Sequence, residues 1–267
     1  MGYIFQFQDA VTYQAWHKSP RNQFILELEH RLMLDLLKPV RGYNILDIGC
    51  GIGTTLQFFT DCGLEATGVE PSPYMLDAAR KKVGNRADLY RCFGEDLPFD
   101  DNSFNYACLF TSLEFVDNPQ KVLEEACRVA KNKLFIGILN RYSAKSVQIR
   151  VRGMFTQTVY NRARFFSIWG IKRKLHTVLG DVPITWKTVR QVPLLSGFLT
   201  HWFERSQMAQ QSPLGDFAGI VVTLIPRFKT RTLPLAVHPK RTAETVPSLK
   251  TRLNSGLKSR TEKMEEK

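Results

Sequence analysis

The most informative segment of this chain is Ile45-Leu46-Asp47-Ile48-Gly49-Cys50-Gly51-Ile52-Gly53. Residues 44–48 form a short apolar run, which is typical of a buried strand. The glycines that follow allow the backbone to turn sharply and to approach a ligand closely. A helix is expected from Thr54, with Gly63 as its end. Strand, glycine turn and helix together predict a nucleotide-type cradle, in which amide groups at the helix start face the ligand.

The spacing of the glycines narrows the choice of ligand. A dinucleotide-binding fingerprint requires its third glycine at position 54, where this chain has Thr54. A nicotinamide-dependent oxidoreductase is therefore disfavoured. The chain instead has D-x-G-x-G-x-G, which begins at Asp47. The alternative, a glycine turn that binds nothing, is weakened by the residues that follow.

Strands and helices are expected to alternate beyond this segment. Helices are predicted to begin at Ser19-Pro20, Ser72-Pro73, Pro119 and Ser167, where serine or proline suits a helix start. Further strands are predicted at residues 64–69, 89–93, 104–110, 133–139, 184–189 and 217–225. Residues 141–166 show no clean period. This order predicts an α/β fold with a doubly wound, mostly parallel seven-stranded sheet.

The motifs resemble those of the class I S-adenosylmethionine-dependent methyltransferases. The pattern at 47–53 resembles motif I of that family, and residues 70–76 resemble the second motif of its type 11 group, which includes quinone-biosynthesis C-methyltransferases. Residues 94–104 resemble the third motif, and residues 124–129 the E-x-x-R-V region. The resemblance covers about residues 40–140 and implies a Rossmann-like methyltransferase sheet with S-adenosyl-L-methionine as cofactor.

The parts of this cofactor make separate demands on the site. Its amino-acid end needs close backbone approach and a nearby carboxylate, which the glycines and Asp47 supply, and its ribose diol suits the carboxylate of Glu70. A ligand-free Asp47 would be a buried acid that needs other donors. The cofactor-binding residues are predicted to be Asp47, Gly49, Cys50, Gly51, Gly53, Glu70, Pro71, Phe93, Gly94, Glu95, Phe110 and Thr111.

Two positions depart from the family pattern. The aspartate that usually meets the adenine amine aligns with Phe93, so Phe93 is expected to pack against the ring while the amides of Gly94 and Glu95 bond to it. Glu95 has an alternative role as an acid that stabilises a turn. Asn105 replaces the usual aspartate of the fourth strand and is interpreted as structural.

The segment after the fourth strand is where this fold presents residues to a substrate. Glu114 is the candidate catalytic base there, and its alternative role is to cap or salt-bridge a helix. Residues 109–112, Leu-Phe-Thr-Ser, lack the Asp/Asn-Pro-Pro-aromatic motif of amino-methyltransferases that act on nucleobases, which disfavours base N-methylation. Tyr13 and Trp16 precede the first expected helix and are candidates for a lid, with plain packing as the alternative.

Charge is distributed unevenly along the chain. Residues 1–139 carry a net charge of −4, whereas residues 140–190 carry +10. Three interpretations of the basic segment, residues 141–181, stay open: a solvated surface, arginines that hold an anionic small substrate or carrier, and contact with a membrane or nucleic acid. One domain is expected over residues 1–226, followed by a basic tail at 227–267 that is expected to be mobile.

Cysteine usage and the chain start bear on location. The five cysteines have no CxxC spacing and are interpreted as reduced thiols of a cytoplasmic protein. The first residues lack the basic region of a signal peptide, and no metal site is expected from the histidines or cysteines.

These expectations combine into one functional hypothesis. The sequence predicts methyl transfer from S-adenosylmethionine to a small molecule, anionic or lipid-like. The alternatives are an RNA or protein methyltransferase and a non-catalytic cofactor-binding scaffold. Nucleic acid is disfavoured as a partner, peripheral membrane contact is allowed, and the oligomeric state is left open.

Overall fold

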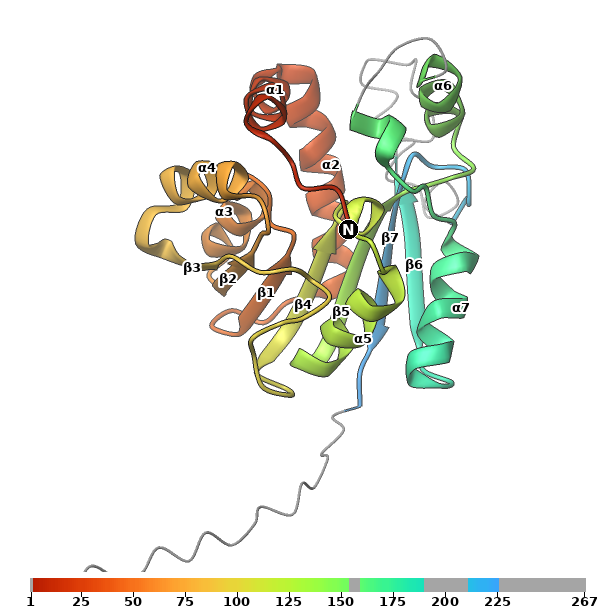
Figure 1. Cartoon of the computed structure of the whole chain (residues 1–267). Coiled ribbons are helices and arrows are strands. Elements are labelled where there is room, and N and C mark those ends of the chain that lie inside the picture. Colours follow the sequence, from red (N-terminus) through yellow and green to blue (C-terminus); the bar gives the residue numbers. More distant parts are fainter. Residues whose placement is uncertain (1, 154–158, 190–210, 226–267) are drawn as a thin grey trace, which may run out of the picture. The chain divides into compact units, whose positions relative to one another are not determined.

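The protein is built around one seven-stranded sheet with helices on both faces (Figure 1). A computed structural model describes residues 2–153, 159–189 and 211–225. The strand order is β3-β2-β1-β4-β5-β7-β6, with β7 antiparallel to both neighbours and the other pairs parallel. The strands are β1 (Asn44–Ile48), β2 (Glu65–Val69), β3 (Ala87–Tyr90), β4 (Phe104–Phe110), β5 (Ala130–Leu139), β6 (Ile184–Val189) and β7 (Phe217–Thr223).

Strand β1 lies at the point where the strand order reverses. It pairs in parallel with β2 on one side and with β4 on the other. Asp47 of β1 is thereby opposite Gly68 of β2 and Cys108 of β4. Open α/β sheets bind ligands beyond the carboxyl ends of their strands at such a reversal. The topology therefore places the segment from Asp47 to Gly53 at the expected binding position.

The helices begin largely where the sequence predicts. Ser72, Asn118 and Ser167 accept a backbone N–H at the start of their helices, whereas Ser19 makes no such side-chain bond. The α-helices are α1 (Phe7–Lys18), α2 (Pro20–Leu37), α3 (Thr54–Asp61), α4 (Pro73–Val83), α5 (Pro119–Val129), α6 (Ala144–Gly153) and α7 (Ile168–Leu179). Short 3-10 turns are η1 (Gly84–Arg86), η2 (Leu113–Phe115) and η3 (Val159–Arg162).

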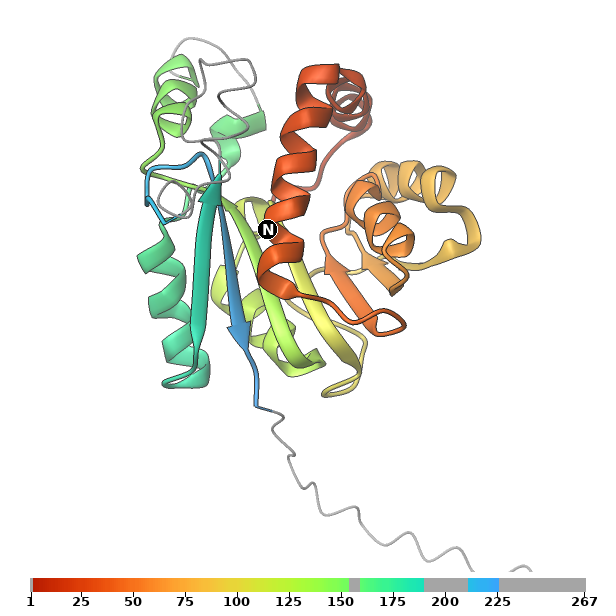
Figure 2. The same ribbon diagram turned by 180° about the vertical axis from the view of Figure 1, so that it is seen from behind.

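Alternating residues of β1 divide the core between the two faces of the sheet. Leu46 and Ile48 belong to a buried cluster that includes residues of α5 and α7. Ile45 belongs to a second cluster with residues of α2 and α3. Figure 1 shows α5 and α7 on the near face, and Figure 2 shows α2 crossing the opposite one. Because both faces are covered, the central strands are apolar on both sides.

The predicted sheet is confirmed, and two local predictions are wrong. The third strand is predicted at 89–93 but lies at Ala87–Tyr90, so Phe93 is in the following loop. An additional helix, α1, precedes the one predicted to come first. The aperiodic segment contains the helix α6. These elements have few buried residues of their own, so their sequences carry little of the periodicity that marks a core element.

No helix within the described parts of the chain is long and apolar enough to cross a membrane. The predicted tail at 227–267 lies outside the described residues, so its character stays a prediction.

Candidate functional site

The glycine loop after β1 is bonded to β2 and packed against the end of β4. The amides of Gly49 and Cys50 donate to the carbonyl of Val69 at 2.8 and 3.0 Å. Gly49 has φ +76°, and a Cβ there would lie 2.5 Å from the Cβ of Ser112. Gly51 has φ +54° and faces the ring of Tyr13. Only glycine meets both requirements at position 49, a left-handed backbone and a contact that leaves no room for a methyl group.

We expect Gly49→Ala to lower the free energy of unfolding by about 2 to 4 kcal/mol, because the left-handed backbone and the contact with Ser112 both oppose a side chain. Gly42→Ala is the matched control, since Gly42 has φ +80° but no atom within 4 Å of the place where a Cβ would lie, and it should cost about 1 kcal/mol. Urea unfolding measures both. Equal losses in the two variants would show that the contact with Ser112 is not restrictive.

Glu70 follows β2 and joins the glycine loop to the second motif. Its Oε2 accepts the amide of Gly51 at 3.0 Å, and its Oε1 accepts the amide of Ser72 at 2.9 Å. The side chain is buried, and burial raises the pKa of Glu70 to about 7 although the two amide bonds favour the charged form. A carboxylate offers about four acceptor positions. Both oxygens therefore retain capacity for further donors such as hydroxyl groups.

Asp47 lies in β1 with a buried and poorly satisfied carboxylate. Its side chain is 1% exposed, and neither oxygen has a partner of ordinary geometry among the described residues, although the Cys108 thiol, a weak donor, lies beside it. Burial, with the nearby Glu70 charge, raises the pKa of Asp47 to about 7. A buried acid without donors costs free energy in the folded protein. This orphaned carboxylate is the strongest indication in the fold that a ligand belongs here.

The remaining predicted cofactor residues lie around this pair with different roles. Phe93 is 40% exposed in the loop after β3, where a flat ring could pack on it. A Cβ on Gly94 would meet Ile48 at 3.0 Å, so Gly94 lets this loop lie against β1. Glu95 Oε1 accepts the amides of Asp117 and Asn118 ahead of α5, which favours its turn-stabilising alternative.

Cys50 and Pro71 flank the two carboxylates. Cys50 is buried, and burial raises the pKa of its thiol well above the usual value, so it is an uncharged packing group. Pro71 is half-buried, and its carbonyl accepts a bond from Arg91 Nε at 3.2 Å. Because its thiol is buried and uncharged, Cys50 can contact a ligand only through its backbone or through apolar packing.

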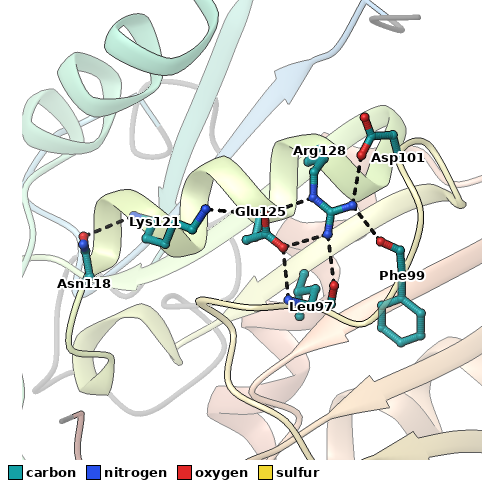
Figure 3. Close-up of polar contacts among 7 residues, drawn as sticks. All are labelled: Leu97, Phe99, Asp101, Asn118, Lys121, Glu125 and Arg128. Atoms are coloured by element: carbon teal, nitrogen blue, oxygen red, sulfur yellow. Dashed lines mark hydrogen bonds and ion pairs between the residues drawn. The ribbon is translucent and has the colours of Figure 1, made fainter. Parts of the chain in front are cut away.

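Arg128 of α5 holds the loop that contains the third motif (Figure 3). Its guanidinium donates to the carbonyls of Leu97 and Phe99 at 3.0 and 2.6 Å and to Asp101 at 3.0 Å. It also bonds Glu125, whose Oε2 accepts the Leu97 amide. Burial alone would raise the pKa of Glu125, but these bonds lower it. The E-x-x-R-V motif therefore acts structurally by shaping the loop that carries Phe93 to Glu95.

The residue that follows β4 has a strained backbone conformation. Thr111 has φ +50°, an uncommon value for a β-branched residue. Its amide donates to the Gly137 carbonyl at 2.9 Å, and Ser112 Oγ donates to the Ile48 carbonyl at 2.7 Å. The ring of Phe110 lies 5.2 Å from His30 of α2. Such outliers cluster at binding and catalytic sites.

Glu114, the candidate base, lies in η2, and its side chain is buried. Its Oε1 accepts the amide of Leu139 at 2.7 Å, and its Oε2 is buried without a partner in the described parts of the chain. Burial raises the pKa of Glu114 to about 7, and the charge of Glu29 on α2 raises it further. Within the described ranges, these oxygens form no ion pair and cap no helix, so the structural alternative predicted for Glu114 is not what the structure shows.

Glu114 should make the stability of the folded chain depend on pH. Its pKa rises from 4.5 to about 7 on folding, so its stabilising effect is present below the lower value and lost as pH rises through the higher one. Glu114→Gln cannot ionise at this position. Across that pH interval we therefore expect its free energy of unfolding to rise by about 3 kcal/mol relative to that of the native chain. Urea unfolding at stepped pH measures this difference. Glu124→Gln, at an exposed position of α5, should follow the native curve throughout, and a parallel curve for Glu114→Gln would contradict the assignment.

Helix α1 covers the glycine loop, which the sequence did not reveal. Tyr13 packs with a buried cluster that contains Ile52 of the loop and Met75 of α4. His17 Nδ1 lies 3.5 Å from Thr54 Oγ1, and its Nε2 is buried with no partner among the residues that the structure describes. Tyr13 and Trp16 thus lie within a helix, not ahead of the first one, and Tyr13 covers the loop. The short, mostly exposed helix has no apolar stripe that would locate it.

The basic segment contributes two arginines beside η2. Arg164 donates its amide to the Glu114 carbonyl and its guanidinium to the Asp117 carbonyl, each at 2.8 Å. The Arg162 guanidinium lies 4.6 Å from the centre of the Tyr3 ring. They line a hollow of about 270 Å³ with Gly2, Tyr3, Glu114, Phe115, Val116 and Asp117. Thus residues of the segment after β4 and of the basic segment meet at one place.

Comparisons with known proteins agree with this geometry. A family model described as a methyltransferase domain, type 11, matches residues 46–136. Over residues 46–136 the chain is therefore similar to this methyltransferase-domain family. The match contains the two buried carboxylates and the glycine loop, and it confirms the family resemblance seen in the motifs.

The curated relatives match this chain over only part of their own length. An uncharacterized protein of Methanocaldococcus jannaschii is 35% identical over 136 residues, 50% of this chain and 60% of the relative. A demethylmenaquinone methyltransferase of Renibacterium salmoninarum is 34% identical, covering 38% and 42%. A sterol 4-C-methyltransferase of Caenorhabditis elegans is 32% identical, covering 38% and 32%. The chain thus spans between about a third and 60% of the length of these relatives.

Solved structures share the fold over more of the chain. A protein of Thermotoga maritima, described as a possible histamine N-methyltransferase, has a TM-score of 0.59 at 23% identity, covering 81% of this chain and 96% of that one. The [4+2]-cyclase SpnF has a TM-score of 0.53 at 17% identity, covering 74% and 80%. Proteins with different reactions therefore share this fold, so the reaction must be argued from the site residues.

Proposed function

We propose that this protein transfers a methyl group from S-adenosylmethionine to a small, lipid-like acceptor. The observation that carries the proposal is the pair of buried carboxylates at the switch point, Asp47 without ordinary donors among the described residues and Glu70 bonded to the glycine loop. The ribose hydroxyls, the ammonium group and the sulfonium of S-adenosylmethionine would supply further hydrogen-bond donors and positive charge to these carboxylates. The family match at residues 46–136 supports the same cofactor class.

Each part of the cofactor has a matching group on the chain. Two observations fit the cofactor. Asp47 is buried without a hydrogen-bond partner of ordinary geometry among the described residues, and Gly49 leaves open a space that a Cβ would fill. Glu70 would receive the ribose hydroxyls, Phe93 would pack on the adenine, and the glycine loop with Asp47 would hold the amino-acid end. When bound, the cofactor supplies an electrophilic methyl group, and the chain supplies alignment, which can account for much of the rate.

Glu114 is proposed as the base for an acceptor that must lose a proton. Its pKa of about 7 suits a base that works near neutral pH, and its Oε2 has no competing partner in the described ranges. The hollow beside η2, lined by Glu114, Arg162 and Arg164, is the proposed acceptor entrance. Two relatives are named for quinone and sterol substrates, which favours a lipid-like acceptor over an anionic one.

The experiment is a labelling assay with the full chain, methyl-labelled S-adenosylmethionine and a metabolite and lipid extract, read by mass spectrometry. Label in a small lipid-soluble compound supports the proposal. Label in RNA or protein would replace the acceptor class, and tight cofactor binding without label in any fraction would support the scaffold alternative. A cytoplasmic location stays a prediction.

A further inference from the structure

An exposed apolar surface lies on α6 and the first turns of α7. Tyr142, Val147, Val151 and Trp169 are 54%, 48%, 53% and 53% exposed. Large apolar side chains are normally exposed singly, so a cluster requires an explanation. We call this surface the α6–α7 face and define it as Arg141, Tyr142, Val147, Arg150, Val151, Trp169 and Arg173.

Two direct contacts link members of the α6–α7 face. Val147 and Val151 are four residues apart and so share one side of α6. The rings of Tyr142 and Trp169 meet edge to face with centroids 6.0 Å apart. Arg150 reaches back from α6 to the Arg141 carbonyl at 3.0 Å, which connects the helix to the turn that carries Tyr142.

The charges on this surface have one sign. Residues 140–180 contain no aspartate or glutamate. Arg141, Arg150 and Arg173 are exposed, and none of them forms an ion pair with a carboxylate in the described ranges. Arg173 lies one turn after Trp169 on the exposed side of α7, whose buried side is Ile168, Ile171 and Leu175. Exposed cations therefore accompany exposed apolar side chains on both helices, Arg150 beside Val147 and Val151 on α6 and Arg173 beside Trp169 on α7.

We propose that the α6–α7 face docks onto an anionic lipid bilayer, with Trp169 and Tyr142 at headgroup depth and the arginines against lipid phosphates. Trp and Tyr favour that depth because their rings are apolar with one polar atom, and each basic residue near an anionic surface adds to the attraction. A nucleic acid would use the arginines but would leave Val147 and Val151 without a role. The bilayer therefore explains more of the surface.

Helix α6 lies at the same end of the sheet as the proposed acceptor site. Helix α6 begins five residues after β5 ends, and Figure 1 shows α6 and α1 at the same end of the sheet. Glu114 and the hollow beside η2 lie at that end. Docking would thus bring the acceptor side of the domain near the bilayer. The inference goes beyond the proposed function and does not depend on methyl transfer.

Vesicle flotation with the full chain and no cofactor tests the proposal. We expect binding to phosphatidylcholine vesicles that contain phosphatidylglycerol, weak binding to phosphatidylcholine alone, and release as salt is raised. Arg150→Gln with Arg173→Gln should lower the partition coefficient about tenfold or more, and Val151→Ser with Trp169→Ser should lower it to a similar degree.

The matched control keeps the test specific to this face. Lys81→Gln with Lys131→Gln removes two exposed cations from α4 and β5 and should leave binding close to that of the native chain. A blue shift of tryptophan emission on anionic vesicles should disappear in Trp169→Phe. The proposal is overturned if the native chain ignores anionic vesicles, if the face variants bind as the native chain does, or if the variants lose only binding to an RNA or DNA oligonucleotide.

Discussion

Glu70→Gln is expected to weaken the binding of S-adenosylmethionine about 10- to 100-fold. The substitution replaces a charged acceptor of hydroxyl groups, and hydrogen bonds to charged groups contribute about 1.5 to 3 kcal/mol. It also turns one oxygen into a donor that faces the amide of Gly51 or Ser72. Isothermal titration calorimetry on the native and variant chains gives the two dissociation constants.

The pH dependence of that affinity adds a second readout. Hydroxyl donors favour the ionised carboxylate, so native affinity should rise with pH through about 7, where Glu70 titrates in the free chain. The variant should show a flatter profile. Glu65→Gln, at the exposed start of β2, is the control and should bind as the native chain does. Unchanged affinity in a folded Glu70→Gln chain would remove Glu70 from the site.

Glu114→Gln is expected to slow methyl transfer about 100- to 10,000-fold while leaving cofactor affinity unchanged. Positioned general bases contribute about that much, and Glu114 lies in η2 on the segment after β4. The native rate should fall as pH drops below about 7, because the base must be ionised to take a proton. Initial rates of label transfer into the acceptor found in the extract assay measure both effects.

The control separates catalysis from folding. Glu124→Gln should retain the native rate and its pH profile, since Glu124 is exposed on α5. A Glu114→Gln chain that binds cofactor and transfers label at the native rate would show that the acceptor needs no base at this position. The role of Glu114 would then be confined to its bond with the Leu139 amide.

Three buried carboxyl groups with pKa values near 7 lie at one end of the sheet. They are Asp47 after the centre of β1, Glu70 beyond β2 and Glu114 beyond β4. Acidic residues with strongly shifted pKa values concentrate at functional sites, because catalysis and binding require such shifts. The orphaned oxygens of Asp47 and Glu114 make the same point geometrically. The free energy that their burial costs is expected to be recovered by bound ligands.

The sequence predicts β1, the glycine loop and the start of α3 because these depend on local backbone requirements. Gly49 and Gly51 adopt left-handed backbone, and Glu70 meets the loop at a spacing set by β2. The third strand lies earlier than predicted because β3 is at the edge of the described sheet, where β2 is its one neighbour among the described strands and its residues alternate between exposed and half-buried. An edge strand needs no continuous apolar run.

Other parts of the site depend on distant contacts and could not be predicted. Helix α1 buries only Ala10, and its position over the loop comes from Ile52 and Met75, which lie far along the chain. The enclosure of Glu114 and its proximity to Glu29 require α2 to pack against β5, β6 and β7. The sequence alone does not reveal whether a carboxylate is buried or exposed. Its pKa therefore follows only from the fold.

Asp47, Glu70 and the glycine loop are proposed to hold S-adenosylmethionine, and the proposed methyl transfer depends on that contact. Calorimetric titration of the folded 267-residue chain with S-adenosylhomocysteine, the demethylated product, examines the contact without requiring a known acceptor. We predict saturable binding to one site, lost in Glu70→Gln combined with Asp47→Asn. Absence of binding by the folded native chain, or equal binding by the folded double variant, would contradict the proposal.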